Sequence, residues 1–184
     1  MHLGSNRVGQ VPFLCYFCKV DETPFTALNG RPRRLLRLIS IVLSYFHQPE
    51  ALEWQIGRLE ALSNLPFELI MVDDCSRDGV LPERLLDSNL SGSVIQLRER
   101  VKWNIPEVRN WGMLFAAGDF CLRTDLDHRP TRETLERLVG MNHERGTALR
   151  FARIDEQGQT IHPHTDSWFL SKQDYWEIGG YDER

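Results

Sequence analysis

The stretch LIMVDDCSRDG, Leu69 to Gly79, runs from four apolar residues directly into two adjacent carboxylates. Leu69 to Val72 show no alternation of apolar and polar residues, which is typical of a strand that is buried on both faces of a parallel sheet. Ligands bind at the carboxyl ends of such strands. Asp73 and Asp74 are therefore candidate ligand-binding residues. A turn cap before Ser76 is the structural alternative for either of them.

Apolar strands and amphipathic helices alternate along the rest of the chain, which predicts an α/β fold with a mainly parallel sheet and right-handed crossovers. Strands are expected at 38–44, 69–72, 93–97, in DFCLRTDLDH from Asp119, and more weakly at 148–154. Helices are expected to begin near Pro49, Pro82 and Pro106 and after Thr131, which can cap the last of them.

Three of these helices have apolar residues spaced for one buried face. The expected buried residues are Leu52, Ile56, Leu59 and Leu62 in the first helix, Val108, Trp111, Leu114 and Phe115 in the third, and Leu135, Leu138 and Val139 in the last. The helices are therefore expected to flank the sheet.

The chain has 184 residues, enough for one hydrophobic core, and we expect one domain over 38–184 after an irregular arm over 1–37. The formal net charge of -4 gives no basic footprint, so no nucleic-acid partner is expected. The cationic run RPRRLLR at 31–37 is interpreted as a solvated lead-in to a strand.

No apolar stretch approaches the roughly 20 residues of a membrane span, and the amino terminus lacks a signal-peptide pattern, so a cytoplasmic protein without a transmembrane segment is expected. Cys15 and Cys18 have a recognisable spacing, but a zinc site usually needs two such pairs. Cys75 and Cys121 are expected to be buried thiols.

A second acidic strand end, TDLDH at Thr124 to His128, follows the strand in DFCLRTDLDH. Asp125 and Asp127 are two residues apart, so they point the same way if the chain stays extended. Converging carboxylates repel unless a cation or proton lies between them, and oxygen ligands suit Mg²⁺ or Mn²⁺. A pair of solvated turn residues is the alternative reading of this motif.

Four blocks of the sequence together resemble the family 2 glycosyltransferases, which are inverting enzymes with the GT-A nucleotide-sugar fold. The blocks are SIVLSYFHQPEAL, ELIMVDDCSRDG, VRNWGMLFAAGDFCLRTDLDH and SWFLSKQDYWEIGGYDE. The resemblance implies a GT-A-like fold with a Rossmann-like nucleotide-binding half. It also implies transfer of a sugar from a nucleotide diphosphate donor, with a UDP-sugar favoured, to an unknown glycan, lipid or protein acceptor.

The resemblance also implies roles for residues at the strand ends. Asp73 or Asp74 would contact the base or ribose, Ser44, Tyr45 and Phe46 would line the nucleotide pocket, Arg109 and Asn110 would face the donor, and Asp125 and Asp127 would form the metal-binding D-x-D motif. Mn²⁺ or Mg²⁺ is the implied cofactor.

The sequence departs from the family pattern at several positions. Ser44-Tyr45-Phe46-His47 stands where Pro-Thr-Tyr-Asn is common, and His128 follows the D-x-D motif where an Asp is frequent. His128 is either a third metal ligand or a surface residue, and the surface role is favoured because oxygen suits Mg²⁺ better than imidazole does. His162 and His164 are expected to be solvated.

The family usually has a further acidic motif after GGYDE that supplies the catalytic base, and this chain ends at Arg184. The sequence is therefore a fragment, or a short form, or one in which Asp182 or Glu183 is the base. Gly179 and Gly180 are expected to end a helix in each case. A nucleotide-sugar-binding module without turnover is the alternative function. A nucleotidyltransferase ranks last, because SYFHQPE is not a Gly-rich phosphate loop.

Overall fold

The computed structural model describes residues 13–18, 38–76, 78, 80–99, 104–154, 159–161 and 166–183. Its main sheet has seven strands in the order β1-β4-β3-β2-β5-β9-β6. These strands are β1 (Phe13–Cys18), β2 (Ile39–Tyr45), β3 (Phe67–Asp73), β4 (Gly92–Leu97), β5 (Phe120–Arg123), β6 (Ala148–Arg150) and β9 (Trp168–Ser171). The helices are α1 (Pro49–Glu60), α2 (Val80–Leu86), α3 (Ile105–Phe115), α4 (Arg132–Gly140) and α5 (Lys172–Glu177).

The centre of the sheet is parallel and its edges are antiparallel. β4, β3, β2 and β5 run in the same direction, with Ile41 of β2 opposite Leu69 of β3 and Leu122 of β5. β1 pairs antiparallel with β4, β9 with β5, and β6 with β9. The predicted α/β fold with a mainly parallel sheet is confirmed for this centre.

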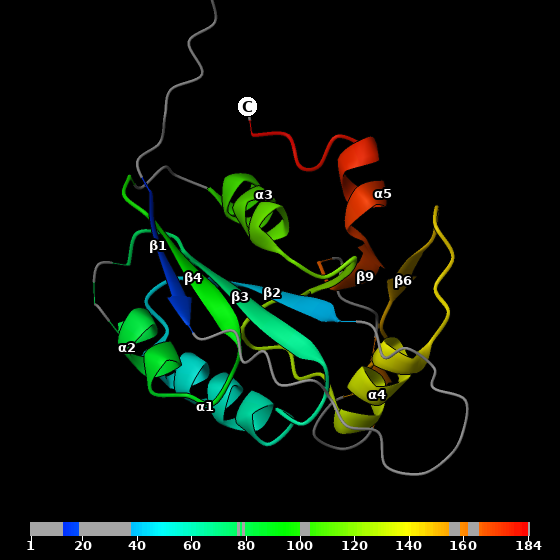
Figure 1. The fold of residues 1–184 in the computed structure, drawn as a ribbon, viewed down its shortest axis with the longest axis horizontal. Coiled ribbons are helices and arrows are strands. Elements are labelled where there is room, and N and C mark those ends of the chain that lie inside the picture. Colours follow the sequence, from blue (N-terminus) through cyan, green and yellow to red (C-terminus); the bar gives the residue numbers. More distant parts are fainter. Residues whose placement is uncertain are drawn as a thin grey trace, which may run out of the picture.

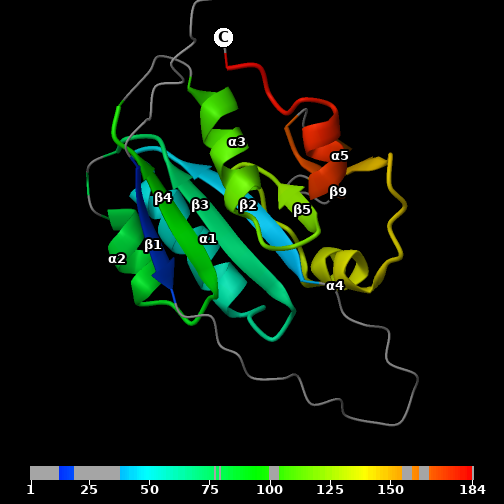
Figure 2. The ribbon, with the colours of Figure 1, turned by 45° about the horizontal axis from the view of Figure 1, so that its top comes forward.

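Helices cover both faces of the sheet, as the unbroken apolar strands predicted. On one face, Ile41 and Leu43 of β2 belong to the core cluster that contains the buried residues of α1, α2 and α4. On the other face, Val42 belongs to a second cluster with Val108 and Met113 of α3. Figures 1 and 2 show α3 and α5 together on this second face, with the C-terminal segment running beside α3.

The buried face of α3 differs from the expected one. Val108 is buried as expected, but Leu114 is 53% exposed, and Met113 lies in the core instead. The helix lies close to the sheet at Gly112, where an added Cβ would come within 2.3 Å of a methyl carbon of Val42. This close approach turns Leu114 outwards. The spacing of apolar side chains along the helix does not reveal such an approach, because glycine has no side chain to count.

Two expected irregular or extended segments are also corrected. Within the arm expected to be irregular, Phe13–Cys18 forms β1, because an aromatic and apolar run pairs readily with the open edge of β4. The strand expected at 148–154 is interrupted: Phe151 packs against the core, and β7 (Arg153–Ile154) pairs with β8 (Thr160–Ile161) in a separate sheet. The cationic run at 31–37 lies outside the described residues.

The helix ends follow the predicted signals. The Thr131 hydroxyl accepts a hydrogen bond from the amide of Thr134 at 3.1 Å and caps α4. Gly179 and Gly180, with φ of 94° and 67°, end α5 in the left-handed region that glycine tolerates. The strand β9, which directly precedes α5, was not predicted from the sequence as a separate element.

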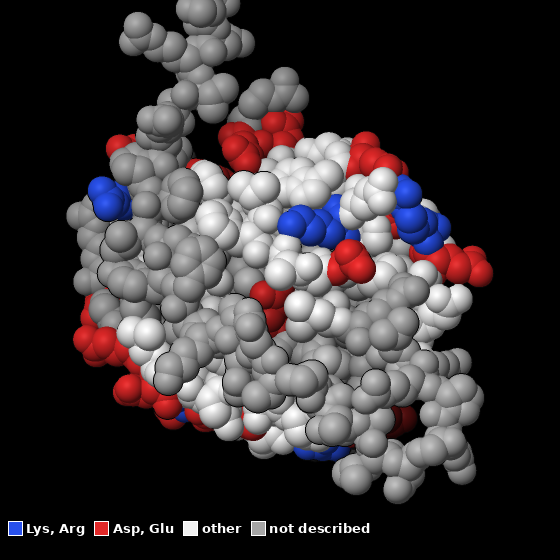
Figure 3. All heavy atoms as spheres, viewed as in Figure 1, with Lys and Arg blue, Asp and Glu red and all other residues white. Residues whose placement is uncertain are grey.

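The surface of the described residues carries charges of both signs. On the face shown in Figure 3, described Lys and Arg side chains lie next to Asp and Glu side chains. Within the described ranges, no helix is long and apolar enough to cross a bilayer.

Candidate functional site

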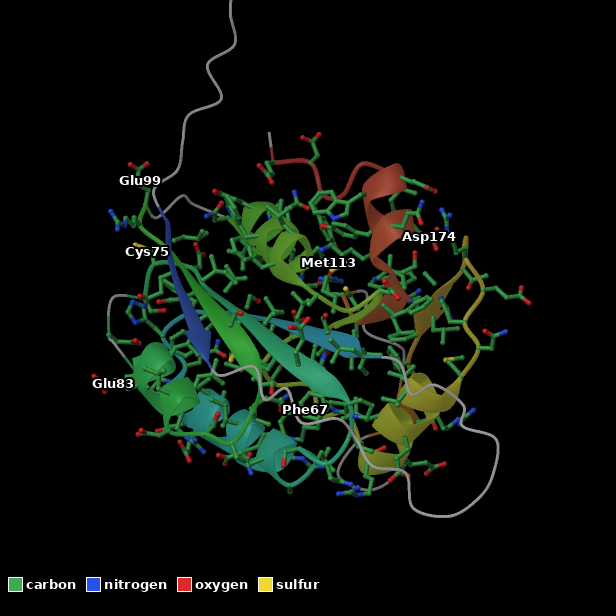
Figure 4. All side chains as sticks on the ribbon, in the orientation of Figure 1. Phe67, Cys75, Glu83, Glu99, Met113 and Asp174 are labelled. Carbon is green, nitrogen blue, oxygen red and sulfur yellow. The ribbon has the colours of Figure 1, made fainter. Side chains whose placement is uncertain are left out.

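The candidate residues follow the carboxyl ends of the parallel strands. Figure 4 marks this edge of the sheet by Cys75 and Glu99, which follow β3 and β4, and the opposite edge by Phe67 at the start of β3. A small hollow between α3 and the sheet, too narrow to hold a water molecule, lies near this edge. It is lined by Val42, Leu43, Ser44, Val108, Arg109, Arg123 and Thr124.

The two carboxylates at the end of β3 have different environments. Asp73 is 1% exposed, and its carboxylate accepts hydrogen bonds from the Ser76 amide at 2.9 Å and from Gln96 Nε2 at 3.1 Å. Asp74 is partly exposed, and its Oδ1 accepts from Asn104 Nδ2 at 3.3 Å. Asp73 therefore has the capping role, and Asp74 is the carboxylate that remains accessible to a ligand.

At the end of β2, only part of the predicted pocket wall reaches the site. Ser44 lines the hollow and Phe46 is partly exposed. Tyr45 is fully buried in the core, and its hydroxyl donates a hydrogen bond to Asp78 at 2.9 Å. Burial, together with this hydrogen bond, raises the pKa of Tyr45. The Tyr45 side chain therefore packs in the core cluster that contains the apolar residues of α1 and does not line the hollow.

Arg109 links the first turns of α3 to two acidic residues. Its guanidinium lies 3.6 Å from the carboxylate of Asp125 and 3.2 Å from that of Asp166. Asp166 precedes β9, and sequence reasoning did not identify it as a site residue. Arg109 thus lies beside Asp125 of the D-x-D motif, and its contact with the donor stays a prediction.

A second arginine in the hollow was also missed. Arg123 ends β5, is 3% exposed and lies 3.6 Å from Asp166. The guanidinium carbons of Arg123 and Arg109 are 5.2 Å and 5.1 Å from the centre of the Tyr181 ring. Burial, and then the neighbouring Arg109, lower the pKa of Arg123. A charged residue inside the apolar run FCLR was the signal that could have identified it.

Asn110 holds the C-terminal segment instead of facing the hollow. Its amide donates to the Tyr181 carbonyl at 2.9 Å and to Glu183 at 2.6 Å, while its oxygen accepts from the Tyr181 amide at 3.0 Å and from the Tyr175 hydroxyl. All of its polar atoms are engaged. Asn110 therefore has a structural role in this chain, and its contact with the donor stays a prediction.

Asp125 and Asp127 do come together, but for a different reason from the one expected. The chain is not extended here: the His128 amide donates to the Asp125 carbonyl at 3.0 Å, which closes a turn that the buried Leu126 anchors. The turn brings ligand atoms of Asp125, Asp127 and His128 within 4.8 Å of one another. The side chain of Asp127 is 77% exposed, so it is open to a ligand.

His128 is not the surface residue that was expected. Its side chain is 16% exposed, and Nδ1 lies 2.8 Å from the Ser167 hydroxyl. Two carboxylates and one imidazole fit a divalent cation, because these groups are ordinary ligands of Mn²⁺ and related ions. The residues present therefore suit the ion that the fold family implies.

The other candidate carboxylates, cysteines and histidines lie outside the turn at Asp125 to His128. Asp182 and Glu183 are both exposed, on the segment that follows Gly180. Cys75 and Cys121 are buried thiols, as predicted. His162 and His164 lie outside the described residues, and so do the side chains of Cys15 and Cys18.

Comparisons with known proteins identify the family of the chain. A family model described as Glycosyl transferase family 2 matches residues 40–182. A search of the curated proteins found no match.

Solved glycosyltransferase structures share the fold. The mannosyltransferase PcManGT from Pyrobaculum calidifontis, in complex with GDP-Man and Mn²⁺, superposes with a TM-score of 0.62 at 17% identity, over 79% of this chain and 47% of that one. S. aureus TarS 1-349 in complex with UDP gives a TM-score of 0.53 at 21% identity, over 78% and 49%. The chain thus spans about half the length of these structures.

Proposed function

Because the chain belongs to glycosyl transferase family 2, we propose that it takes part in inverting transfer of a sugar from a nucleoside diphosphate-sugar to an acceptor hydroxyl, with a divalent cation. One observation carries this proposal. Asp74 after β3, and Asp125 and Asp127 after β5, flank β2 at the carboxyl edge of the parallel sheet. This is the edge where α/β proteins bind nucleotides.

Donor binding is assigned to the residues that the geometry leaves accessible. We assign the base or ribose to Asp74, whose carboxylate can accept hydrogen bonds from an N–H or from hydroxyl groups. Phe46, partly exposed at the end of β2, offers an aromatic face to the base. A UDP-sugar remains the favoured donor. The structures of similar fold contain UDP in one case and GDP-Man in the other.

Asp125 and Asp127 would hold Mn²⁺ or Mg²⁺. When bound, such an ion neutralises negative charge that develops on a departing diphosphate. Arg109, already 3.6 Å from Asp125, supplies a second positive charge on the same side of the site. A guanidinium can bind two phosphate oxygens at once, so Arg109 is assigned to orient the diphosphate.

The acceptor hydroxyl needs a group that takes its proton as it attacks the anomeric carbon. We assign this role to the C-terminal segment, where Asp182 and Glu183 are exposed carboxylates. Both carboxylates are candidates, and Glu183 also accepts a hydrogen bond from Asn110 Nδ2 at 2.6 Å. Because the chain spans about half of the structures of similar fold, the acceptor is proposed only as a hydroxyl compound.

The test is calorimetry of UDP binding with Mn²⁺, with and without a chelator, on the wild-type chain and on Asp127→Ala. Chelation should abolish most of the binding, and the variant should bind UDP weakly with or without metal. Asp127→Ala should keep its thermal stability within about 0.5 kcal/mol, since its side chain is largely exposed. Glu136→Ala on α4 is an exposed acidic control that should leave UDP binding unchanged.

Two results would contradict the assignment. Equal UDP affinity with and without chelator removes the metal from the proposal. A loss of stability in Asp127→Ala comparable to that of a core mutation shows that the carboxylate is structural. GDP, titrated in parallel, tests the base preference, and tighter binding of GDP would reverse it.

A further inference from the structure

We propose that His128 is the third protein ligand of the cation at Asp125 and Asp127, and that its imidazole makes the site prefer Mn²⁺ over Mg²⁺. The proposal deepens the proposed function and rests on it. The D-x-D motif alone supplies only carboxylate oxygens. His128 adds a nitrogen ligand in a place where the family pattern often has another Asp.

The position of the ring is the first observation. His128 Nε2 lies 4.0 Å from Asp127 Oδ1, and ligand atoms of His128, Asp125 and Asp127 all lie within 4.8 Å of one another. Two atoms bound to the same ion at about 2.1 Å are separated by roughly 3.0 to 4.2 Å, depending on their angle at the metal. Small side-chain shifts would therefore allow one ion to contact all three groups.

The support behind the ring is the second observation. His128 Nδ1 lies 2.8 Å from Ser167 Oγ and 3.3 Å from Thr124 Oγ1, and these two hydroxyl groups are 2.9 Å apart. Thr124 and Ser167 are both buried. Thr124 directly follows β5, and Ser167 directly precedes β9. The ring orientation is thus fixed by residues outside the acidic turn.

This arrangement is the one that a metal-binding histidine uses. Such a residue coordinates through one ring nitrogen and donates the proton of the other to a fixed partner, which sets the tautomer and the direction of the ring. In His128 the hydroxyl of Ser167 is that partner, and the opposite nitrogen is directed towards the carboxylate of Asp127. Packing of the ring against the turn would not by itself direct Nε2 towards a carboxylate.

The ligand type has a consequence for metal choice. Mg²⁺ favours oxygen ligands and near-ideal octahedral geometry, whereas imidazole is a good ligand of transition ions. Exchanging a carboxylate for an imidazole therefore lowers the affinity for Mg²⁺ more than that for Mn²⁺. The site of this chain should discriminate between the two ions more strongly than a site built only from aspartates.

The test uses pulsed electron paramagnetic resonance on the wild-type chain with Mn²⁺ and UDP, where a coordinated imidazole gives a ¹⁴N modulation of the electron spin echo. The wild type should show this modulation and His128→Ala should lose it. His47→Asn is the matched control. His47 follows β2 and has a φ of 45°, which asparagine tolerates, so this variant should fold. It should keep the ¹⁴N modulation.

Metal affinities give an independent readout. His128→Ala should bind Mn²⁺ at least about tenfold more weakly, with a smaller loss for Mg²⁺, so that the preference for Mn²⁺ narrows. Ser167→Ala should retain the ¹⁴N modulation but weaken Mn²⁺ binding by about 10-fold, because the ring loses its partner.

The outcomes separate this inference from the function on which it rests. Mn²⁺ bound together with UDP, but without ¹⁴N modulation in the wild type, overturns the role of His128 and leaves the transferase proposal standing. An unchanged preference for Mn²⁺ over Mg²⁺ in His128→Ala also overturns the role of His128 and leaves the transferase proposal standing. Absence of UDP-dependent Mn²⁺ binding in the wild type overturns both.

Discussion

Asn110 Nδ2 on α3 donates a hydrogen bond of 2.6 Å to the carboxylate of Glu183, 73 positions later in the sequence. The same side chain holds both backbone polar groups of Tyr181. Tyr181 in turn lies over Arg109 and Arg123. One buried amide therefore fixes the C-terminal segment against the helix that carries Arg109.

Asn110→Ala should destabilise the fold by about 2–3 kcal/mol, because it leaves the Tyr175 hydroxyl and the Tyr181 backbone without their partner. Urea unfolding at neutral pH measures the change. Leu114→Ala on the same helix is the control, and it should change stability by no more than about 0.5 kcal/mol because Leu114 is exposed. Equal effects of the two substitutions would show that Asn110 does not anchor the segment.

Substitutions at Asp73 and Asp74 should separate folding from binding. Asp73→Ala should cost about 1–3 kcal/mol of stability, since the Ser76 amide and Gln96 lose a buried acceptor. Asp74→Ala should cost less stability and weaken UDP binding, because this carboxylate is the accessible one. Thermal unfolding and calorimetry on both variants measure the two effects. A variant pair with the reverse pattern contradicts the assignment of Asp74 to the nucleotide.

Asp182→Asn should lower sugar transfer by on the order of 10²–10⁴-fold while UDP binding stays unchanged, as expected for loss of a general base. Glu183→Gln tests the second carboxylate of the segment, and its amide oxygen can still accept the hydrogen bond from Asn110, so this contact is kept. Release of UDP from UDP-sugars, with and without candidate acceptors, provides the measurement. Full acceptor-dependent activity in Asp182→Asn would remove this residue from the mechanism.

Much of the parallel core was predictable because its signals are local. The unbroken apolar run ending in Asp73 predicted a strand covered on both faces, and both core clusters confirm this. Thr131 and the pair Gly179-Gly180 marked helix ends through backbone requirements that depend on a few neighbouring residues. Such requirements can be read from sequence without knowledge of distant contacts.

The parts that sequence reasoning missed depend on long-range contacts. The orientation of α3 follows from Gly112 against Val42, and the role of Asn110 follows from residues some 70 positions away. Asp166 became a site residue only when its segment came beside Arg109. The turn at Asp125 to His128 likewise replaced an extended strand, because burial of Leu126 closes it.

Asp174 on α5 should contribute to the acid sensitivity of the fold. Its carboxylate accepts a hydrogen bond from the Gly146 amide at 2.8 Å and lies 3.3 Å from Arg145. The Gly146 hydrogen bond is the main reason why the pKa of Asp174 falls below its ordinary value of 3.8. The ionised form is therefore the one that the native state favours.

A lowered native pKa fixes the sign of the pH effect. The stabilisation is complete above the ordinary pKa of 3.8 and is lost as the pH falls through the lower native value. Asp174→Asn should therefore be less stable than the wild type at pH 7, and the difference should shrink as the pH is lowered below about 4. Urea unfolding across this range measures it, with Glu136→Gln, an exposed residue on α4, as the control. A difference between wild type and Asp174→Asn that stays constant down to pH values well below the ordinary pKa would show that the carboxylate charge is not what joins α5 to the turn at Gly146.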